Sequence, residues 1–394
     1  MSNTPVANIC HITIFGDRNS GKSSLFNAII NQDIAIIDET LGTTTDPIHK
    51  RIELLPFGPV LLTDTAGMDD EGDLGKKRIE KSKKMYARTN FGIVLFDATK
   101  NNFDHSCESE LAKFDISYVK VFNKIDLISN EKLEQLKKDF PNALFVATND
   151  FKSVLDFKES LMHKLSIQEN RSIIGKYLNP KDNVVLVIPI DSEAPKGRLI
   201  LPQVQVIRDL LDYNINAIIT NENNLVETLK NIDNVMMVIT DSQVFHKIKD
   251  IVPDSIYLTS FSILFAHYKS NLNNFSLTLP TKVSNVLICE SCTHNVGHED
   301  IGMVKIPRLL KKRYGDIEIK HVMGNDFVSS LDNFDLIIHC GSCMLNDSVM
   351  KYRINLAKES NVLFTNYGLY LAYESDILDR SIQFFKDKNI IKVN

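Results

Sequence analysis

The chain has 394 residues, of which 43% are hydrophobic and 24% charged, so it has the composition of a soluble globular protein with two or three domains. Its formal net charge of −5 argues against a nucleic-acid partner, and no apolar stretch approaches the roughly 20 residues that cross a bilayer. The first residues lack a basic region followed by an apolar run, so we expect a cytoplasmic protein with no signal peptide and no membrane partner.

The first motif is a glycine-rich loop after an apolar strand expected at residues 9–15. GDRNSGKSS fits G-x-x-x-x-G-K-[ST], and SLFNAII, a helix-forming sequence, follows it. In such a loop backbone N–H groups surround phosphates, and the helix adds its positive N-terminal end. A glycine turn formed by chance is the alternative, which the flanking strand and helix disfavour. Lys22 is predicted to contact the β and γ phosphates and Ser23 to bind Mg²⁺. The residues predicted to bind nucleotide here are Gly16, Asn19, Ser20, Gly21, Lys22, Ser23 and Ser24.

Two further motifs are typical of loops that sense the γ-phosphate. GTTTDP offers Thr43 and Thr44, and we expect Thr44 to be a second Mg²⁺ ligand. VLLTDTAG predicts a strand ending at Asp64, which would hold Mg²⁺ through water, while the backbone N–H of Gly67 would contact the γ-phosphate. The polar run 69–84 falls where a second switch segment is expected, although such charge runs are usually solvated surface.

The next motifs point to guanine as the base. VKVFNKID supplies Asn123, Lys124 and Asp126. The carboxylate of Asp126 can accept two hydrogen bonds from the N1–H and exocyclic amino group of guanine, which adenine cannot offer. Ala147 and Thr148 follow the predicted strand ALFV, where a loop would close over the base. Because these motifs occur together in one chain order, they predict a domain that binds GTP rather than ATP.

On these motifs the first domain resembles the TrmE–Era–EngA branch of the translation-factor-type GTPases. The resemblance implies that Asn19, which matches an asparagine of that branch, helps to bind a K⁺ ion that assists hydrolysis. Met68 stands where Ras-like enzymes have the glutamine that orients the attacking water, which implies slow turnover or catalysis that uses a cation. Thr45 stands where the branch usually has arginine, so this part of the match is imperfect. The residues assigned to hydrolysis are Asn19, Lys22, Thr44, Asp64 and Gly67.

The middle of the chain carries no ligand motif. After the turn NPKDN, apolar runs such as VVLVIPI alternate with helix-length amphipathic segments, which predicts βαβ units and a small parallel sheet. EAPKGRLILPQVQ brings apolar residues together, which favours either a self-association surface or an ordinary internal core. The expected domains are residues 1–170, 178–270 and 271–394.

The last domain contains two cysteine–histidine segments, CESCTHNVGHED and IIHCGSCMLN, each after a predicted strand, at 285–289 and 334–338. Because parallel sheets bind ligands at the carboxyl ends of their strands, one pocket can collect both segments. Four cysteines suit zinc, but the 47 residues between Cys292 and Cys340 exceed the roughly 12 to 20 usual in such sites. Cys289 continues an apolar strand and can face the core, which leaves three thiolates for an iron–sulfur cube. The metal ligands expected are Cys292, Cys340 and Cys343, with His294, His298, Glu299 or His339 as the candidate fourth ligand.

The chain resembles the HydF family of FeFe-hydrogenase maturation GTPases over its whole length. The resemblance is carried by the GTPase motifs and by the pattern C-x-H, then 44 residues, then H-C-x-x-C. The resemblance implies an α/β protein of three domains: a P-loop GTPase with a mostly parallel sheet, a small α/β dimerisation domain, and a Rossmann-like cluster-binding domain. It implies a 4Fe–4S cluster on Cys292, Cys340 and Cys343, with His294 and His339 as motif histidines. It also implies a homodimer that receives a transient two-iron precursor from two radical-SAM maturases and carries it to the apo-hydrogenase.

Two other functions are consistent with parts of the sequence. A housekeeping GTPase with a structural zinc site would carry a basic RNA-binding appendage, and none is found. A metallochaperone for nickel or zinc would carry a histidine-rich tract, whereas the ten histidines here are dispersed. The carrier interpretation is therefore favoured, with GTP, Mg²⁺, K⁺ and a 4Fe–4S cluster as the expected cofactors.

Overall fold

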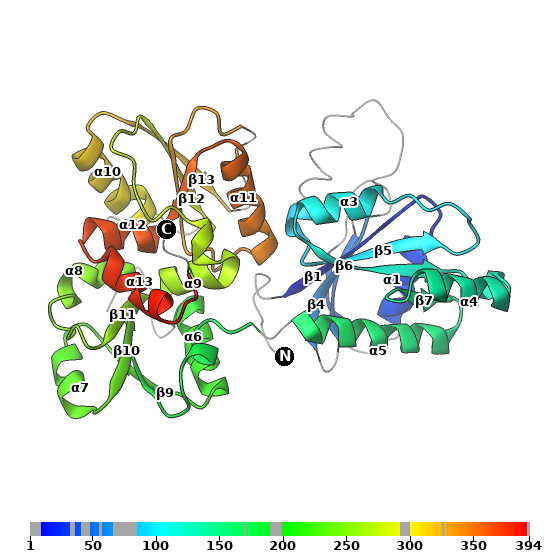
Figure 1. Ribbon diagram of the computed structural model, residues 1–394, viewed down its shortest axis with the longest axis horizontal. Coiled ribbons are helices and arrows are strands. Elements are labelled where there is room, and N and C mark those ends of the chain that lie inside the picture. The colour runs from blue at the N-terminus through cyan, green and yellow to red at the C-terminus, as the bar shows by residue number, and fades with distance from the viewer. Residues whose placement is uncertain are drawn as a thin grey trace. The chain divides into compact units, whose positions relative to one another are not determined.

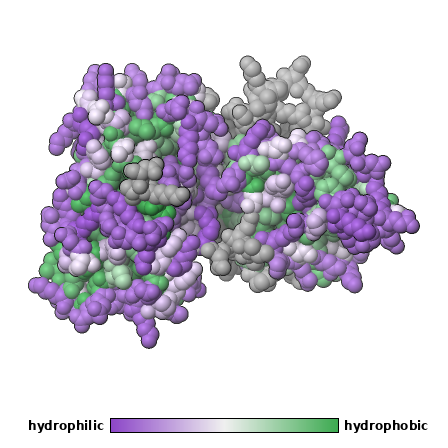
Figure 2. Space-filling view, in the orientation of Figure 1, coloured by the Kyte–Doolittle hydropathy of each residue, from purple (hydrophilic) through white to green (hydrophobic). Residues whose placement is uncertain are grey.

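The structure of the chain, a computed structural model, divides into two compact units, Met1–Asn170 and Arg171–Asn394. It describes residues 9–31, 36–40, 48–54, 57–65, 85–168, 171–189, 199–291, 300–324, 327–328 and 330–391 (Figure 1). None of the helices in these ranges has the length and apolar character required to cross a membrane. Polar and charged side chains cover most of the face in Figure 2, and apolar side chains gather there only in small groups.

In the first unit, seven strands form one sheet in the order β2-β3-β4-β1-β5-β6-β7. The pairs β1–β4, β1–β5, β5–β6 and β6–β7 are parallel, while β3 is antiparallel to both β2 and β4. The strands are β1 Cys10–Gly16, β2 Ile36–Thr40, β3 Ile48–Leu54, β4 Gly58–Asp64, β5 Phe91–Asp97, β6 Ser117–Asn123 and β7 Leu144–Val146. The helices are α1 Lys22–Asn31, α3 Ser106–Lys113, α4 Asn130–Asp139 and α5 Phe151–Gln168.

Helices cover both faces of this sheet, with α3 and α5 on opposite sides in Figure 1. Ile12 of β1 packs with Leu25 of α1 and Phe157 of α5 in the core of one face. Phe122 of β6 packs with Leu111 of α3 in the core of the other. Because both sides are covered, the interior strand β5 is buried at all seven residues, which explains its nearly continuous apolar sequence FGIVLFD.

The second unit contains two four-stranded parallel sheets, in the orders β11-β10-β8-β9 and β13-β12-β14-β15. The first sheet consists of β8 Asn183–Val187, β9 Asn216–Thr220, β10 Val235–Thr240 and β11 Tyr257–Ser260, with helices α6 Leu201–Asp212, α7 Leu225–Asn231, α8 Phe245–Ile248 and α9 Phe261–Ser270. The second consists of β12 Asn285–Glu290, β13 Glu318–Met323, β14 Leu336–His339 and β15 Leu363–Asn366. Its helices are α10 Ile306–Tyr314, preceded by a π-helical turn at Ile301–Lys305, α11 Asp347–Glu359, α12 Tyr367–Glu374 and α13 Leu378–Asp387.

One continuous hydrophobic core joins the two sheets of the second unit. It includes Val185 of β8, Leu287 of β12 and Leu264 of α9, all fully buried. Helix α9 contacts α6, which belongs to the first sheet, and α11 and α12, which belong to the second. The last helix, α13, packs against β11, where the Tyr257 hydroxyl donates to Asp387 at 2.9 Å. The expected border at residue 270 therefore falls at the end of a helix that both sheets share.

The predicted α/β class with mostly parallel sheets is confirmed. When strands are counted along the chain, both sheets of the second unit have the order 2-1-3-4. In such a sheet the chain leaves in opposite directions from strands 1 and 3, and ligands bind at their carboxyl ends. This position falls between β12 and β14 in the second sheet, where the predicted cysteine segments begin. Helices α10 and α11 lie on opposite sides of these strands (Figure 1).

Candidate functional site

The glycine-rich loop connects β1 to α1 as the sequence predicts. Gly16 has a φ of 144°, and a Cβ there would lie 2.3 Å from the carbonyl oxygen of Leu95, so only glycine fits. Lys22 is buried, and its ammonium donates to the carbonyl oxygens of Gly16 and Asp17 at 2.7 and 2.9 Å. Ser23 is exposed in the first turn of α1. The loop thus combines a buried cation with an accessible hydroxyl at a helix N-terminus, as phosphate and Mg²⁺ binding require.

The base-binding motif is attached directly to this loop. The side-chain amide of Asn123 donates to the carbonyl oxygen of Ser20 at 3.0 Å, across 103 residues of sequence. A Cβ at Gly21 would lie 2.3 Å from Asn123 Nδ2, so the second glycine provides the space for this contact. Lys124, in the left-handed region with φ 63°, donates to the carbonyl oxygen of Asn19 at 2.8 Å. The geometry therefore fixes the distance between the phosphate side and the base side of the site.

Asp97 is a residue of this site that the sequence analysis did not identify. It ends β5, and its carboxylate accepts from Lys124 Nζ at 2.6 Å and from the hydroxyl of Thr99 at 2.7 Å. Burial alone would raise the pKa of Asp97, but the hydrogen bonds from Lys124 and Thr99 outweigh it and hold the pKa below its ordinary value. An aspartate at the carboxyl end of a fully apolar strand is the signal that could have identified it.

The groups expected to contact the base lie at the rim. Asp126 is exposed and accepts from the side-chain amide of Asn149 at 2.9 Å. The backbone N–H of Ala147 donates to Ser153 at 2.9 Å, which orders the loop that also contains Thr148. Asn123 Oδ1 is buried with no hydrogen-bond partner in the described part of the chain, so it is available to a donor on a ligand. These features fit a guanine nucleotide.

Only some of the residues expected to bind Mg²⁺ lie within the described part of the chain. Asp64 ends β4 at 1% exposure, and Ile14 pairs with it, so its carboxylate lies beside the strand that leads into the glycine-rich loop. The predicted residues Thr43, Thr44 and Gly67, and the segment 69–84, lie outside the described residues.

The second site is the cysteine loop, residues 340–346, which connects β14 to α11. Cys340 follows β14 directly, and its backbone N–H donates to the carbonyl oxygen of Cys289 on β12 at 2.9 Å. Its sulfur contacts the backbone N–H and the hydroxyl of Ser291, both at 3.1 Å, and the N–H of Ser342 at 3.4 Å. Burial raises the pKa of the Cys340 thiol, and these hydrogen bonds oppose the rise. Donors directed at a sulfur in this way suit a thiolate ligand of a metal cluster.

His339 is held by both ring nitrogens. Nε2 lies 2.8 Å from Arg353 Nη1, and Nδ1 lies 3.0 Å from the carbonyl oxygen of Cys340. Burial, reinforced by the Arg353 guanidinium, lowers the pKa of His339 to about 3. The imidazole is therefore neutral, accepts from Arg353 and donates to Cys340, which anchors the start of the cysteine loop.

The other cysteines differ in their surroundings. Burial raises the pKa of the Cys343 thiol to about 11, with Lys269 acting in the opposite direction. Cys289 has 0% exposure and packs in the shared core, where burial raises its pKa well above the ordinary value, so it acts as an apolar residue. The five cysteines in the described ranges are free thiols, and no three potential ligand side chains converge within those ranges. The predicted residues Cys292, His294, His298 and Glu299 lie outside them.

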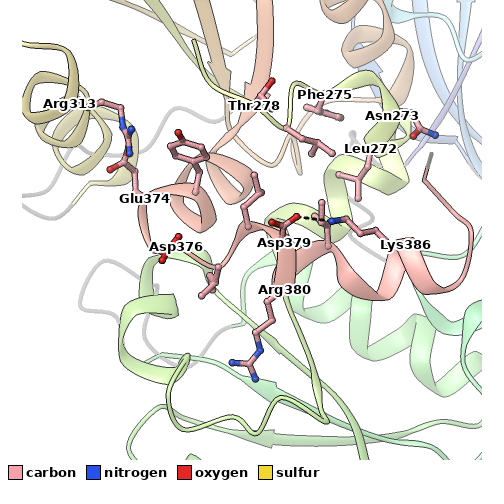
Figure 3. Close-up of a pocket in the computed structure, with 15 residues that line it drawn as sticks. Leu272, Asn273, Phe275, Thr278, Arg313, Glu374, Asp376, Asp379, Arg380 and Lys386 are labelled. Atoms are coloured by element: carbon pink, nitrogen blue, oxygen red, sulfur yellow. Dashed lines mark hydrogen bonds and ion pairs between the residues drawn. The ribbon is translucent and has the colours of Figure 1, made fainter. Parts of the chain in front are cut away.

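A cavity of about 1050 Å³ lies elsewhere in the second unit, between the α9–β12 connection and helices α12 and α13 (Figure 3). Most of its charged side chains have partners. Arg313 donates to Glu374, and Lys386 donates to Asp379 at 2.7 Å. Arg380 extends to the carbonyl oxygens of neighbouring backbone. None of the motif residues from the sequence analysis lines it.

Three family models match successive parts of the chain. The 50S ribosome-binding GTPase model matches residues 11–124. The hydrogen maturase F dimerization domain matches residues 173–270, and the hydrogen maturase F tetramerization domain matches residues 276–384. These last two models together cover more than half of the chain and coincide with the two sheets of the second unit.

The curated relatives match part of the chain. GTPase Der of Kosmotoga olearia is 35% identical over 141 residues, which are 34% of this chain and 32% of that protein. The tRNA modification GTPase MnmE of Ehrlichia canis is 29% identical over 215 residues, 48% of this chain and 45% of that protein. The chain thus spans less than half the length of these relatives. The G domain of the T. maritima FeoB iron transporter is 18% identical, covers 40% of this chain and 99% of its own, and gives a TM-score of 0.29.

The Asp97→Asn variant tests the contact that positions Lys124. We expect the affinity for GTP to fall about tenfold, because a hydrogen bond to a charged group contributes about 1.5–3 kcal/mol. Titration with a fluorescent GTP analogue measures the change. Asp104→Asn is the matched control, since that carboxylate accepts hydrogen bonds from Ser106 at the surface. Equal affinities of the Asp97→Asn and unaltered proteins would show that Asp97 does not support the site.

Proposed function

Because the chain belongs to the hydrogen maturase F family, we propose that it is a GTP-controlled carrier in the maturation of FeFe-hydrogenase. In this function the first unit binds and hydrolyses GTP, and the second holds a 4Fe–4S cluster. The cargo is a two-iron precursor that two radical-SAM maturases supply and the apo-hydrogenase receives in the cytoplasm. The observation that supports it best is Cys340, whose sulfur accepts from two backbone N–H groups and contacts the Ser291 hydroxyl at the carboxyl ends of β12 and β14, in a chain that also carries a GTP site.

The cluster ligands in this proposal are Cys292, Cys340 and Cys343. Ser291, the residue before Cys292, contacts the sulfur of Cys340 through its backbone N–H, which donates, and through its hydroxyl, both at 3.1 Å. With three thiolates, the cluster supplies an iron whose remaining ligand can be exchanged for an incoming group. The neighbouring N–H groups hold Cys340 in place and support its anionic form.

The structure also bears on the fourth ligand. Both nitrogens of His339 have hydrogen-bond partners, and ligation would require it to give up its contact with the buried Arg353. A buried guanidinium that loses its partner is costly. We therefore assign His339 to holding the cysteine loop, and we assign the fourth position to one of His294, His298 and Glu299.

GTP acts as a switch in this proposal rather than as a participant in iron chemistry. Ser23 and Thr44 hold Mg²⁺, Lys22 contacts the β and γ phosphates, and Asn19 contributes to a K⁺ site. Hydrolysis then changes the order of the switch segments and governs partner binding or release.

Self-association is proposed at the edge of the first sheet of the second unit. Strand β9 is the last strand on that side, and Ile219 on it is 52% exposed. Val204 and Leu211 on α6 and Val226 on α7 are 47%, 55% and 44% exposed. An exposed strand edge beside exposed apolar side chains is a surface that soluble proteins normally cover. We propose that a second copy of the chain covers it, in agreement with the match to a dimerization domain.

The cluster is tested by anaerobic reconstitution with iron and sulfide. We expect about four irons per chain and a cubane signal in electron paramagnetic resonance after reduction, as three thiolates and one further ligand allow. Cys340→Ala should lose the signal. Cys107→Ala, in the first unit, should keep it. Stoichiometric zinc without a signal would instead indicate a GTPase with a structural zinc site.

Potassium dependence tests the role of Asn19. We expect GTP hydrolysis to be faster in K⁺ than in Na⁺ at equal ionic strength, by about tenfold if the cation lowers the barrier by ~1.4 kcal/mol. Asn19→Ala should remove this difference, whereas Lys22→Ala should stop hydrolysis in both salts. Phosphate release measures the rates. A K⁺ effect that persists in the Asn19→Ala protein would contradict the assignment.

The dimer surface is tested with Leu211→Glu. Burying an unpaired carboxylate should weaken the dimer at least tenfold, which corresponds to about 1.4 kcal/mol. Sedimentation over a range of concentrations measures the dissociation constant. Leu155→Glu, at a 42% exposed leucine of α5 in the first unit, is the control. If both variants dimerise as the unaltered chain does, self-association uses another surface.

A further inference from the structure

The segment that opens the second unit, residues 171–176, is firmly anchored to α6. One carboxylate, that of Asp209, accepts from the backbone N–H groups of Ile173, Ile174 and Gly175 at 3.1, 2.8 and 2.7 Å. It also accepts from the hydroxyl of Ser172 at 3.0 Å. Four hydrogen bonds to one charged group restrain this segment strongly. The segment that opens the second unit is therefore held in a fixed position and is not a flexible linker.

Arg171, the first residue of this segment, reaches the helix that follows the cysteine loop. Its guanidinium donates to Asp347 at the start of α11 and to the carbonyl oxygen of Tyr268 at the end of α9. It also lies over the Tyr268 ring, 5.0 Å from the ring centre. One side chain thus connects the entry segment, α9 and the N-terminus of α11.

Lys269 contacts Asp347 as well, from the interior of the second unit. Its side chain is only 4% exposed, and its ammonium lies 3.1 Å from Asp347 Oδ1. It also donates to the carbonyl oxygen of Leu345 in the cysteine loop, at 2.9 Å. Asp347 therefore pairs with Lys269 through one oxygen and with Arg171 through the other. The loop that carries Cys340 and Cys343 ends on this three-residue cluster.

The two cations of this cluster differ in how easily they can move. The Arg171 side chain is 45% exposed, so water can replace Asp347 as its partner at low cost. Lys269 is buried and would leave an unpaired charge if it lost Asp347 and Leu345. Lys269 is thus a permanent support, while the contact of Arg171 can be made or broken.

We propose that Arg171 and Lys269, acting through Asp347, are positioning residues of the cysteine loop, and that Arg171 makes the position of this loop depend on the nucleotide state of the first unit. The proposal rests on the proposed function, since it assumes that the loop is the cluster site. Arg171 is the residue that directly follows the first unit in the chain. A change in the order or direction of the chain at the end of that unit therefore acts first on Arg171. Release of Arg171 frees one oxygen of Asp347, which loosens the end of the loop next to Cys343.

The test measures hydrogen exchange of peptides covering residues 340–350 in the metal-free, full-length chain. Exchange is compared with Mg²⁺ and either GDP or a non-hydrolysable GTP analogue. We expect the two states to differ about fivefold, the lower end of ordinary coupling between sites. Arg171→Gln should abolish the difference while GTP hydrolysis stays unchanged, and Arg171→Lys should restore part of it. Lys269→Met should give fast exchange in both states.

Arg313→Gln is the matched control. Arg313 also pairs with a carboxylate, that of Glu374, and lies over a tyrosine ring, 4.7 Å from the centre of Tyr373, but it does not touch the cysteine loop. Its nucleotide response should equal that of the unaltered chain. Asp347→Asn provides a second test, since it keeps the shape and removes the charge.

Three results would overturn the proposal: no nucleotide response in the unaltered chain, a full response in Arg171→Gln, or equal losses in Arg171→Gln and Arg313→Gln. The experiment is independent of cluster binding because it contains no iron. If reconstitution fails, the proposed function fails whatever the exchange shows. If reconstitution succeeds and exchange does not respond to nucleotide, only the role of Arg171 is wrong.

Discussion

The parallel pairing of β12 with β14 is the interaction on which the second site depends. Its register places Cys289 opposite His339, and the Cys340 N–H continues the pattern by donating to Cys289. Ser291 is thereby brought against the sulfur of Cys340, although 49 positions separate them in the sequence. A slip of one residue would exchange the two faces of the strand and turn the sulfur of Cys340 away from Ser291. The apolar residues of both strands therefore determine the relative position of the residues that follow them as well as the core.

The surroundings of the cysteine loop place a buried cation beside each of its ends. Arg353 holds His339 at the start of the loop, and Lys269 holds Leu345 at its end. Both cations are almost fully buried, and each donates hydrogen bonds to neighbouring groups. Such cations favour negative charge nearby, as the effect of Lys269 on the pKa of Cys343 illustrates. Because α9 carries Lys269 and belongs to the core of both sheets, the first sheet of the second unit contributes directly to a site built on the other.

The nucleotide site follows the same principle with other chemistry. Gly21 leaves room for Asn123, and Lys124 binds both the phosphate loop and Asp97, so motifs far apart in sequence form one rigid frame. These contacts connect the carboxyl ends of β1, β5 and β6, three successive parallel strands of the sheet. In both sites, then, a buried parallel sheet determines position, and short loops at its edge supply the reactive groups.

The sequence alone determined the α/β class, the strands of apolar residues and the identity of the chemical groups, because motif spacing and hydrophobic runs are local properties. It could not determine the roles of Asp97, Arg353, Lys269 or Arg171, since each acts on a partner distant in the chain and none belongs to a local pattern. It grouped His339 with the candidate ligands because residue type suggests metal binding, whereas the structure shows both its nitrogens engaged. Strand order and register decide which distant residues meet, and these arise from packing in three dimensions that no short segment of the sequence encodes.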